Sequence, residues 1–400
     1  MNNDLWIRAQ KSVAQGALTN SKHPKMLIMG AYPTHISHGS GSYLFDHEGN
    51  KYTDYICGLG ANFLGYGNDL ISRELIKQIY GGFSHSLPTH HEVECAEKLK
   101  EFFVFTERWK FLKSGSEACN AAIKIARNAT GRDRILSAGY HGWGDEFVSL
   151  TPPACGVPKR SSIRGLKDIS DIDKDVAAVI IEPVITDYGS ERIEYLKELR
   201  KKCTDTGTML IFDEVITGFR FSKFGVCNHT GIIPDLIVIG KAMANGLPLA
   251  AVGGKAEVMD DPRYFVSSTY AGEVLSLVAC KSVLNQLQKN SEYSVDKLWV
   301  HGQEFINQFN EQPGDIKIEG YPTRGIFTGE PENQAIFMGA MAKAYVLFCK
   351  SFFYNFGHQA QDKDILSLTV EIKERIVNKV LKLEYPLPES PFSMKVRQNG

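Results

Sequence analysis

The sequence predicts an α/β fold with a mostly parallel sheet, because short apolar segments alternate with helical patterns between about residues 105 and 255. Polar residues follow these segments, as is typical of strands that end at a ligand site. After about residue 275, longer helical segments replace the alternation. We therefore expect a large domain built around the sheet and a smaller α+β domain formed by both ends of the chain.

Six apolar segments are predicted to be strands of this sheet. They are Trp109–Leu112, Arg134–Ala138, Val176–Ile181, Met209–Phe212, Leu236–Ile239 and a segment near Ala250–Gly253. The polar groups that follow the first five are Ser114-Gly115-Ser116, Tyr140-His141-Gly142, Glu182-Pro183, Asp213-Glu214 and Lys241. Ligands of open α/β sheets bind beyond the carboxyl ends of the strands, so these groups predict one convergent site.

The predicted helices have recognisable ends. Thr89 and Glu92 form a capping-box pattern that begins one helix, and a second helix begins at Ser114-Gly115-Ser116 and ends at Gly131. Later helices are expected over Leu275–Leu287, Asn333–Leu347 and Asp362–Leu383, and a hairpin is expected within Gly41–Asn50. The resulting division is an N-terminal segment (1–55) that packs with the small domain, a large domain (56–275) and a C-terminal small domain (276–400).

Composition excludes several classes of function. The chain has 400 residues, with 45 basic and 46 acidic side chains and a formal net charge of −1, so it lacks the overall charge that attracts nucleic acid or an anionic membrane. Its eight cysteines form no Cys-x-x-Cys pair, which argues against a zinc site or a disulfide framework and favours the cytoplasm. No apolar run approaches the roughly 20 residues that span a bilayer. We expect a soluble enzyme without a metal.

Lys241 and Asp213 carry the predicted chemistry. Each follows a buried apolar segment, and the two are separated by 28 positions. A lysine and a carboxylate suit an aldehyde cofactor with a ring nitrogen, because the amine forms a Schiff base and the acid keeps the ring protonated. The pairing of Asp213 with a nearby arginine such as Arg220, and a merely solvated Lys241, are the alternative interpretations.

Other residues near the strand ends are candidates for binding this cofactor. Ser114, Gly115 and Ser116 would seat a phosphate at a helix start, although a serine helix cap explains the same pattern. Tyr140 or Trp143 would lie over the ring, or would belong to the core. Val215, on the same side of an extended chain as Asp213, would pack on the opposite face of the ring.

Three other site patterns fail on single residues. Gly240-Lys241 is not a P-loop, because position 235 is Asp and position 242 is Ala. A nicotinamide fingerprint at Gly58-Leu59-Gly60 lacks its third glycine. The stretch from His90 to Glu94 lacks the second histidine of a zinc helix.

With these residues assembled, the chain resembles the class III aminotransferases of the fold-type I pyridoxal phosphate enzymes, most closely the glutamate-1-semialdehyde aminomutase-like branch. The matching stretches are Gly41–Asn50, Ser114–Ala118, Tyr140–Gly142, Ile181–Val184, Ile211–Arg220 and Gly240–Gly246. The resemblance implies a fold-type I transferase fold and pyridoxal 5′-phosphate as cofactor.

The resemblance also implies roles for single residues. Lys241 would be the Schiff-base lysine, Asp213 the partner of the ring nitrogen and Tyr140 the stacking ring. Gly115 and Ser116 would form the phosphate cup, and Glu182 would belong to the same cofactor site. Thr269 resembles a threonine that reaches the phosphate of the neighbouring subunit, which implies a homodimer with shared active sites.

The substrate is less determined. Lys22 lies where the aminomutase branch carries an arginine for the substrate carboxylate, and lysine is a poorer bidentate clamp. The segment Lys350–Tyr354 offers no arginine either, and Trp143 is a further candidate for substrate contact. The stretch Pro152–Arg164, with Lys159, Arg160 and Arg164, is either a lid for anionic substrate groups or a solvated connection.

Three functions follow from these observations. The main prediction is an aminotransferase that moves an amino group from a donor such as glutamate to an aldehyde or ketone, with a sugar or nucleotide derivative as the suggested acceptor. The alternative is an intramolecular aminomutase of the glutamate-1-semialdehyde type, which needs no external donor. A regulatory or scaffold protein on the same fold is the third reading, and the retention of Lys241 argues against it.

Overall fold

The computed structural model describes residues 3–151, 154, 156–158, 162–289, 291–358 and 362–388. Contacts among these residues divide the chain into two compact units, which we call unit 1 (within 1–68 and 296–391) and unit 2 (within 69–295). The domain boundaries expected from the sequence, 55/56 and 275/276, stay predictions.

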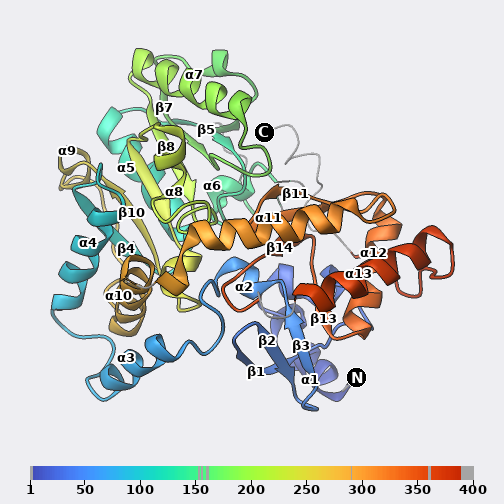
Figure 1. The fold of residues 1–400 in the computed structure, drawn as a ribbon. Helices are drawn as coiled ribbons and strands as arrows, with labels where there is room; N and C mark the ends of the chain where they lie inside the picture. Colours follow the sequence, from blue (N-terminus) through green and yellow to red (C-terminus); the bar gives the residue numbers. More distant parts are fainter. Residues whose placement is uncertain are drawn as a thin grey trace. The chain divides into compact units, whose positions relative to one another are not determined.

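Unit 2 contains a seven-stranded sheet (Figure 1). Its strand order is β4 (Arg108–Leu112), β10 (Ala250–Gly254), β9 (Leu236–Ile239), β8 (Met209–Glu214), β7 (Val176–Ile181), β5 (Arg134–Ala138) and β6 (Ile163–Gly165). Only β10 runs antiparallel to its neighbours within this sheet, so the other six strands share one direction. The predicted α/β fold with a mostly parallel sheet is confirmed, and all six predicted strands are present; β6 was not predicted.

The helices of unit 2 pack on the sheet and on one another. They are α3 (Asp69–Ile79), α4 (His90–Phe102), α5 (Gly115–Thr130), α7 (Ser190–Thr206) and α10 (Val274–Lys289), with the shorter α6 (Asp145–Val148), α8 (Gly225–Thr230) and α9 (Ala256–Met259). Helix α5 packs across several strands, since Ala118, Ala122 and Ala126 on its buried face are small enough for close approach to the sheet. Central strands such as β7 are buried along their whole length, which explains their continuous apolar sequence.

The helix ends in unit 2 follow the sequence signals. Helix α4 begins after Thr89, whose backbone N–H donates to Glu92 Oε1 at 3.1 Å. Helix α5 ends at Gly131, which adopts the left-handed conformation with φ +66°. Both ends are therefore where the sequence predicts them.

Unit 1 contains two smaller sheets. One has the order β1 (Ile36–Ser40), β2 (Tyr43–Asp46), β3 (Lys51–Asp54) and β13 (Val346–Leu347), and the other has β11 (Lys317–Tyr321), β12 (Arg324–Thr328) and β14 (Ser351–Phe353). Its helices are α1 (Asn3–Ser12), α2 (Cys57–Gly60), α11 (Val295–Glu311), α12 (Pro331–Lys343) and α13 (Asp362–Val377). The segment Gly41–Asn50, where a hairpin was expected, contains β2, which pairs antiparallel with β1 before it and with β3 after it.

Two predicted helices of unit 1 end earlier than expected. Helix α12 ends at Lys343 instead of Leu347, and Leu347 belongs to β13. Helix α13 ends at Val377 instead of Leu383. Tyr345 (φ +63°) and Lys379 (φ +56°) adopt the left-handed conformation, which stops a right-handed helix although both sequences stay compatible with one.

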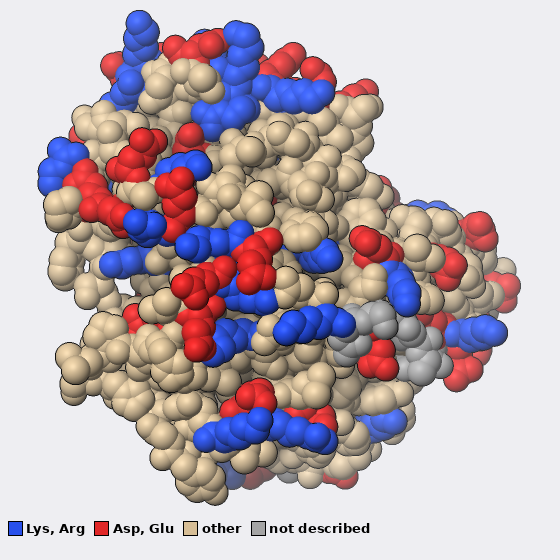
Figure 2. Space-filling model, turned by 60° about the vertical axis from the view of Figure 1, so that its left-hand side comes forward, with Lys and Arg blue, Asp and Glu red and all other residues tan. Residues whose placement is uncertain are grey.

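The surface carries charges of both signs. On the face drawn in Figure 2, basic and acidic side chains are interspersed. Among the described residues, no helix combines the length and the apolar character needed to cross a bilayer.

Candidate active site

Four of the five predicted polar groups follow strands that are direct neighbours in the sheet. Ala138 of β5 pairs with Ile181 of β7, and Ile181 pairs with Phe212 of β8. Glu214 of β8 pairs with Ile239 of β9. Because these strands are parallel, their carboxyl ends meet at one edge, together with the end of β4 beyond the antiparallel β10. The sheet topology thus brings the predicted groups to one edge of unit 2.

Asp213 is buried there, with 5% of its surface exposed. Its Oδ2 lies 2.7 Å from His141 Nδ1 and accepts a hydrogen bond from Cys119 Sγ at 3.3 Å. Its Oδ1 accepts from the backbone N–H of Val215 at 3.0 Å. The interactions of Asp213 within the described chain do not include Arg220, so the alternative pairing is not observed.

The contact with Asp213 favours one tautomer of His141. An ionised carboxylate only accepts hydrogen bonds, so the proton of a neutral imidazole must be on Nδ1. His141 is buried, its ring packs edge-on against Phe147, and its Nε2 has no hydrogen-bond partner among the described residues. His141 is therefore oriented entirely through Asp213 on its polar side.

Lys241 follows β9 after one residue, Gly240, and has a strained backbone conformation. It opens the short helix η5 (Lys241–Ala244) with φ +43°, which is rare for a residue with a side chain and is characteristic of functional sites. Burial and Asp213 raise the pKa of the Cys119 thiol, whereas the positive charge of Lys241 lowers it. The amine of Lys241 is thus within electrostatic range of the Cys119–Asp213 contact.

The side chain of Val215 lies between two backbones of the predicted site. A Cβ added to Gly115 would meet Val215 Cγ1 at 3.0 Å, and one added to Gly240 would meet the same atom at 3.4 Å. Val215 therefore separates the start of α5 from the residue before Lys241. A flat ring with a phosphate at one end and an aldehyde at the other would find an apolar support here.

Three residues at the start of α5, Ser114, Gly115 and Ser116, make different contacts. Ser114 is the helix cap: its Oγ accepts from Glu117 N at 3.2 Å, and its own N–H donates to Glu117 Oε2 at 2.9 Å. Ser116 Oγ accepts from the backbone N–H of Trp143 at 3.1 Å. The backbone N–H groups of Gly115 and Ser116 have no acceptor within the described residues, so they remain available to an anion.

Tyr140 and Glu182 lie on adjacent strand ends and contact one another. The backbone N–H of Tyr140 donates to Glu182 Oε1 at 2.7 Å. Arg192 donates to the backbone oxygens of Glu182 at 3.1 Å and Pro183 at 2.8 Å, which fixes this strand end from the outside. Tyr140 is 43% exposed, so its ring is not part of the core.

The remaining predicted contacts are at the surface. Trp143 is 73% exposed, which excludes the core interpretation, and Thr269 is exposed in a turn of unit 2. Lys22 is an exposed residue of unit 1, in the short helix η2 (Asn20–Lys22). Arg164 belongs to β6 and pairs with Leu136, so the suggested lid does not extend to it. Lys159 and Arg160 lie outside the described residues.

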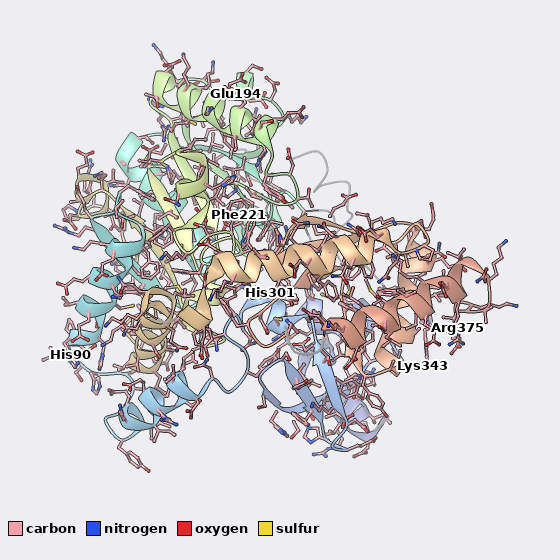
Figure 3. All side chains as sticks on the ribbon, viewed as in Figure 1. His90, Glu194, Phe221, His301, Lys343 and Arg375 are labelled. Atoms are coloured by element: carbon pink, nitrogen blue, oxygen red, sulfur yellow. The ribbon has the colours of Figure 1, made fainter. Side chains whose placement is uncertain are left out.

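Two groups of side chains in unit 2 have metal-ligating atoms close together. Within the first, Cys119, His141 and Asp213, the 2.7 Å between His141 Nδ1 and Asp213 Oδ2 is a hydrogen bond, because ligands of a tetrahedral zinc lie at least about 3.3 Å apart. The second group is His90, His91 and Glu94 on α4, and Figure 3 labels His90. The carboxylate of Glu94 accepts a hydrogen bond from Lys281 Nζ. Neither geometry favours a metal, and its absence stays a prediction.

A separate groove on unit 1 contains none of the predicted site residues. It is lined by residues of α12 and α13, including Lys343 and Arg375, which Figure 3 labels. This groove therefore contributes nothing to the predicted site.

The residues at the sheet edge fit pyridoxal 5′-phosphate. Asp213 offers a fixed carboxylate for a ring nitrogen, the start of α5 offers unpaired N–H groups for a phosphate, and Lys241 offers an amine for an aldehyde. Val215 contacts the backbone beside both the phosphate seat and the lysine. The whole set occurs within unit 2.

Comparison with known proteins identifies the family. The family model described as "Aminotransferase class-III" matches residues 29–159 and 156–330. The chain therefore belongs to the class III aminotransferases, and its cofactor is pyridoxal 5′-phosphate, the cofactor of that family. The sequence-based predictions of family, cofactor and enzyme class are confirmed.

Two curated relatives and one solved structure are similar to this chain. The chain is 32% identical over 318 residues to the glutamate-1-semialdehyde 2,1-aminomutase of Saccharolobus islandicus, covering 73% of this chain and 74% of that protein. It is 34% identical over 336 residues to glutamate-1-semialdehyde 2,1-aminomutase 2 of Lachnoclostridium phytofermentans, covering 77% and 78%. Among solved structures, the FumI protein of Sphingopyxis sp. MTA144 has the same fold, with a TM-score of 0.88 and 24% identity over 96% of this chain and 98% of that chain.

Sequence reasoning did not assign roles to two residues that contact Asp213. His141 was noticed only as part of Tyr140-His141-Gly142, and Cys119 only as one of eight scattered cysteines. Position after β5 could have drawn attention to His141. For Cys119, four residues past a strand-to-helix turn, the helical period gives its direction but not its partner.

Proposed function

We propose that the protein is an aminomutase, which moves an amino group between two carbons of one small amino aldehyde. This reaction was the alternative in the sequence analysis. It is supported by the two aminomutases to which the chain is 32% and 34% identical over about three quarters of its length. The main sequence-based prediction, transfer to a separate acceptor, has less support.

Lys241 and Asp213 are proposed as the catalytic residues. When bound, the cofactor supplies an aldehyde that holds an amino group covalently and a ring that withdraws electrons from the carbon bearing it. The amine of Lys241 would hold the cofactor, then accept and return the proton of that carbon. The carboxylate of Asp213 would keep the ring nitrogen protonated.

The other site residues are proposed to hold the cofactor in place. The backbone N–H groups of Gly115 and Ser116 would bind the phosphate, with Ser116 Oγ beside them. Val215 and Tyr140 would lie on opposite faces of the ring, and Glu182 would fix the backbone of Tyr140. Ser114 would act through the helix start that it caps. Trp143 and Lys22 are proposed substrate contacts.

A second candidate is transfer from a donor such as glutamate to a separate aldehyde or ketone, for instance a sugar or nucleotide derivative. One observation favours it: Lys22 stands where the resemblance to the aminomutase branch implies an arginine. A substrate without a carboxylate would not need the arginine.

The test is an incubation of the loaded enzyme with glutamate-1-semialdehyde alone. Isomerisation with no other amino donor supports the aminomutase. When an amino donor labelled with heavy nitrogen is added, the product should carry none of the label. A requirement for stoichiometric glutamate, with release of its keto acid, would instead establish the second candidate.

The lysine assignment has its own matched pair. Lys241→Ala should abolish the visible band of the bound cofactor and the activity, while the circular dichroism of the fold stays unchanged. Lys255, an exposed lysine of unit 2 paired with Glu107, is the control, and Lys255→Ala should keep both band and activity. Parent-like turnover by Lys241→Ala would refute the assignment.

We further propose a cytoplasmic homodimer in which Thr269 reaches the site of the neighbouring subunit. Its exposed position in a turn of unit 2 is compatible with such a contact. Mixing Lys241→Ala and Thr269→Ala chains tests this arrangement, because each mixed dimer would regain one site with native Lys241 and Thr269. Activity no higher than the sum of the separate variants would reject it.

A further inference from the structure

We propose that Cys119 is a positioning residue of this enzyme, whose thiol fixes the carboxylate of Asp213 so that one acceptor position on Oδ1 remains for the cofactor ring. The inference rests on the proposed role of Asp213. It adds a residue that acts through Asp213 and not on the substrate.

The hydrogen bonds of Asp213 carry the argument. An ionised carboxylate has about four acceptor positions, two on each oxygen. Oδ2 uses both, one toward His141 Nδ1 at 2.7 Å and one toward Cys119 Sγ at 3.3 Å. Oδ1 uses one, toward Val215 N at 3.0 Å. Counting the contacts within the part of the chain that the structure describes, one position is left, and it is on Oδ1.

The three donors also come from different parts of unit 2. Cys119 lies in the first turns of α5, His141 follows β5, and Val215 follows β8 itself. Donors from three directions prevent rotation of the carboxylate about its last bond. With the thiol removed, only His141 would hold Oδ2, and the carboxylate plane would gain freedom to turn.

The thiol stays a donor under working conditions. Cys119 is 1% exposed, and burial, followed by the nearby charge of Asp213, raises its pKa well above the ordinary value. Glu182 adds to this effect and Lys241 opposes it. A protonated sulfur next to an ionised carboxylate can only donate, so the direction of the hydrogen bond is defined.

The competing interpretation is a small apolar side chain that fills space in the core, as buried free cysteines commonly do. Cys203 on α7 provides the matched control. It is fully buried in the same unit, and its Sγ has no hydrogen bond among the described residues. Replacing either cysteine by alanine removes the same atom, but only one replacement removes a donor to Asp213.

The first measurement uses the protein without cofactor. The infrared difference between the native chain and Cys119→Ala isolates the S–H stretching band of Cys119, and the Cys203→Ala difference gives a reference. The Cys119 band should lie at lower frequency than the Cys203 band and should move upward in Asp213→Asn, because a neutral amide is a weaker acceptor. A Cys119 band that is unmoved by Asp213→Asn overturns the inference.

The second measurement is cofactor retention by equilibrium dialysis. Loss of one donor to a charged group predicts that Cys119→Ala raises the dissociation constant about tenfold. Cys119→Ser, which keeps a donor of similar size, should return the constant to within about threefold of the native value. Cys203→Ala should leave it unchanged. Equal effects of the two alanine variants would show space filling and refute the proposal.

The two measurements separate this inference from the proposed function. If the native chain fails to bind pyridoxal 5′-phosphate, the proposed function fails, while the infrared result still decides the thiol–carboxylate bond. If the native chain binds the cofactor and the cysteine variants behave alike, only the role of Cys119 fails.

Discussion

Strand β8 ends in two neighbouring acids that face opposite sides of the sheet and differ in almost every contact. Asp213 is 5% exposed and Glu214 is fully buried. Both accept a hydrogen bond from a cysteine thiol, Cys119 at 3.3 Å and Cys227 at 3.4 Å. The two acids thus lie on the same strand, are both buried and both accept from a thiol. Their differences therefore come from their other hydrogen-bond partners.

The partners of Glu214 are close to it in the sequence. Its carboxylate accepts from the backbone N–H of Val226 at 2.9 and 3.0 Å and from Thr217 Oγ1 at 3.0 Å. These residues belong to the turn and to the start of α8, which Glu214 ties back to the strand. Burial raises the pKa of Glu214 to about 7, although these donors act against the increase.

Two of the three hydrogen-bond partners of Asp213 come from distant parts of the chain, and the third is the backbone N–H of Val215. His141 and Cys119 precede it by 72 and 94 positions, and they meet only because the sheet brings their elements together. The difference shows how a site can be distinguished from a structural acid. The side-chain partners of Glu214 stabilise its own turn, whereas the two side-chain partners of Asp213, His141 and Cys119, stabilise no local turn and orient one carboxylate.

Exchanging each acid for its amide should separate the two roles. Asp213→Asn should lower kcat/KM by on the order of 100-fold, because a neutral amide cannot stabilise the charge of the cofactor ring, and should leave the melting temperature nearly unchanged. Glu214→Gln should keep most of the activity. Steady-state kinetics and calorimetry on both variants check this, and a larger activity loss in Glu214→Gln would invert our comparison.

The pH dependence of stability should be set by Glu214. Its folded-state pKa, about 7, exceeds the ordinary 4.5, so its contribution is complete below pH 4.5 and is lost as the pH rises to about 7. The difference corresponds to about 3 kcal/mol. Glu214→Gln, which resembles the protonated acid, should flatten this part of the profile.

Denaturant unfolding between pH 4 and 8 measures this effect. The native chain should lose stability over that interval relative to Glu214→Gln. Parallel profiles of the two proteins would mean that Glu214 does not retain its proton in the folded state.

The activity should depend on where the side chain at position 141 places its N–H donor. Asparagine can place an N–H donor near the Nδ1 position, whereas glutamine resembles Nε2, so His141→Asn should retain more activity than His141→Gln. We expect about a tenfold loss in kcat for His141→Gln, with KM changed little, because a hydrogen bond to a charged group is lost. Similar losses in both variants would indicate packing instead of orientation.

The same contrast explains what the sequence could predict. Apolar runs with polar ends predicted six strands and placed Asp213 and Lys241 at strand ends, since these signals are local. Cys119 gave no comparable signal, and His141 was found only as part of a strand end, because their contacts with Asp213 depend on which elements the sheet makes neighbours. The sequence also did not predict strand β6 or the left-handed conformation of Tyr345. Both depend on tertiary contacts, such as the three-residue pairing of β6 with β5, which outweigh weak local preferences.

The smallest effect should distinguish the two serines at the start of α5. Ser114 caps the helix through Glu117, so Ser114→Ala should cost about 1 kcal/mol of stability and leave the affinity for the cofactor within about twofold. Ser116→Ala should instead weaken the affinity for the cofactor and leave the stability nearly unchanged. The Oγ of Ser116 accepts from Trp143 N and not from the helix backbone, and it lies beside the proposed phosphate seat. Thermal unfolding of the cofactor-free variants and dialysis with pyridoxal 5′-phosphate separate the effects. A weakened affinity in Ser114→Ala at unchanged stability would place the phosphate at the cap itself.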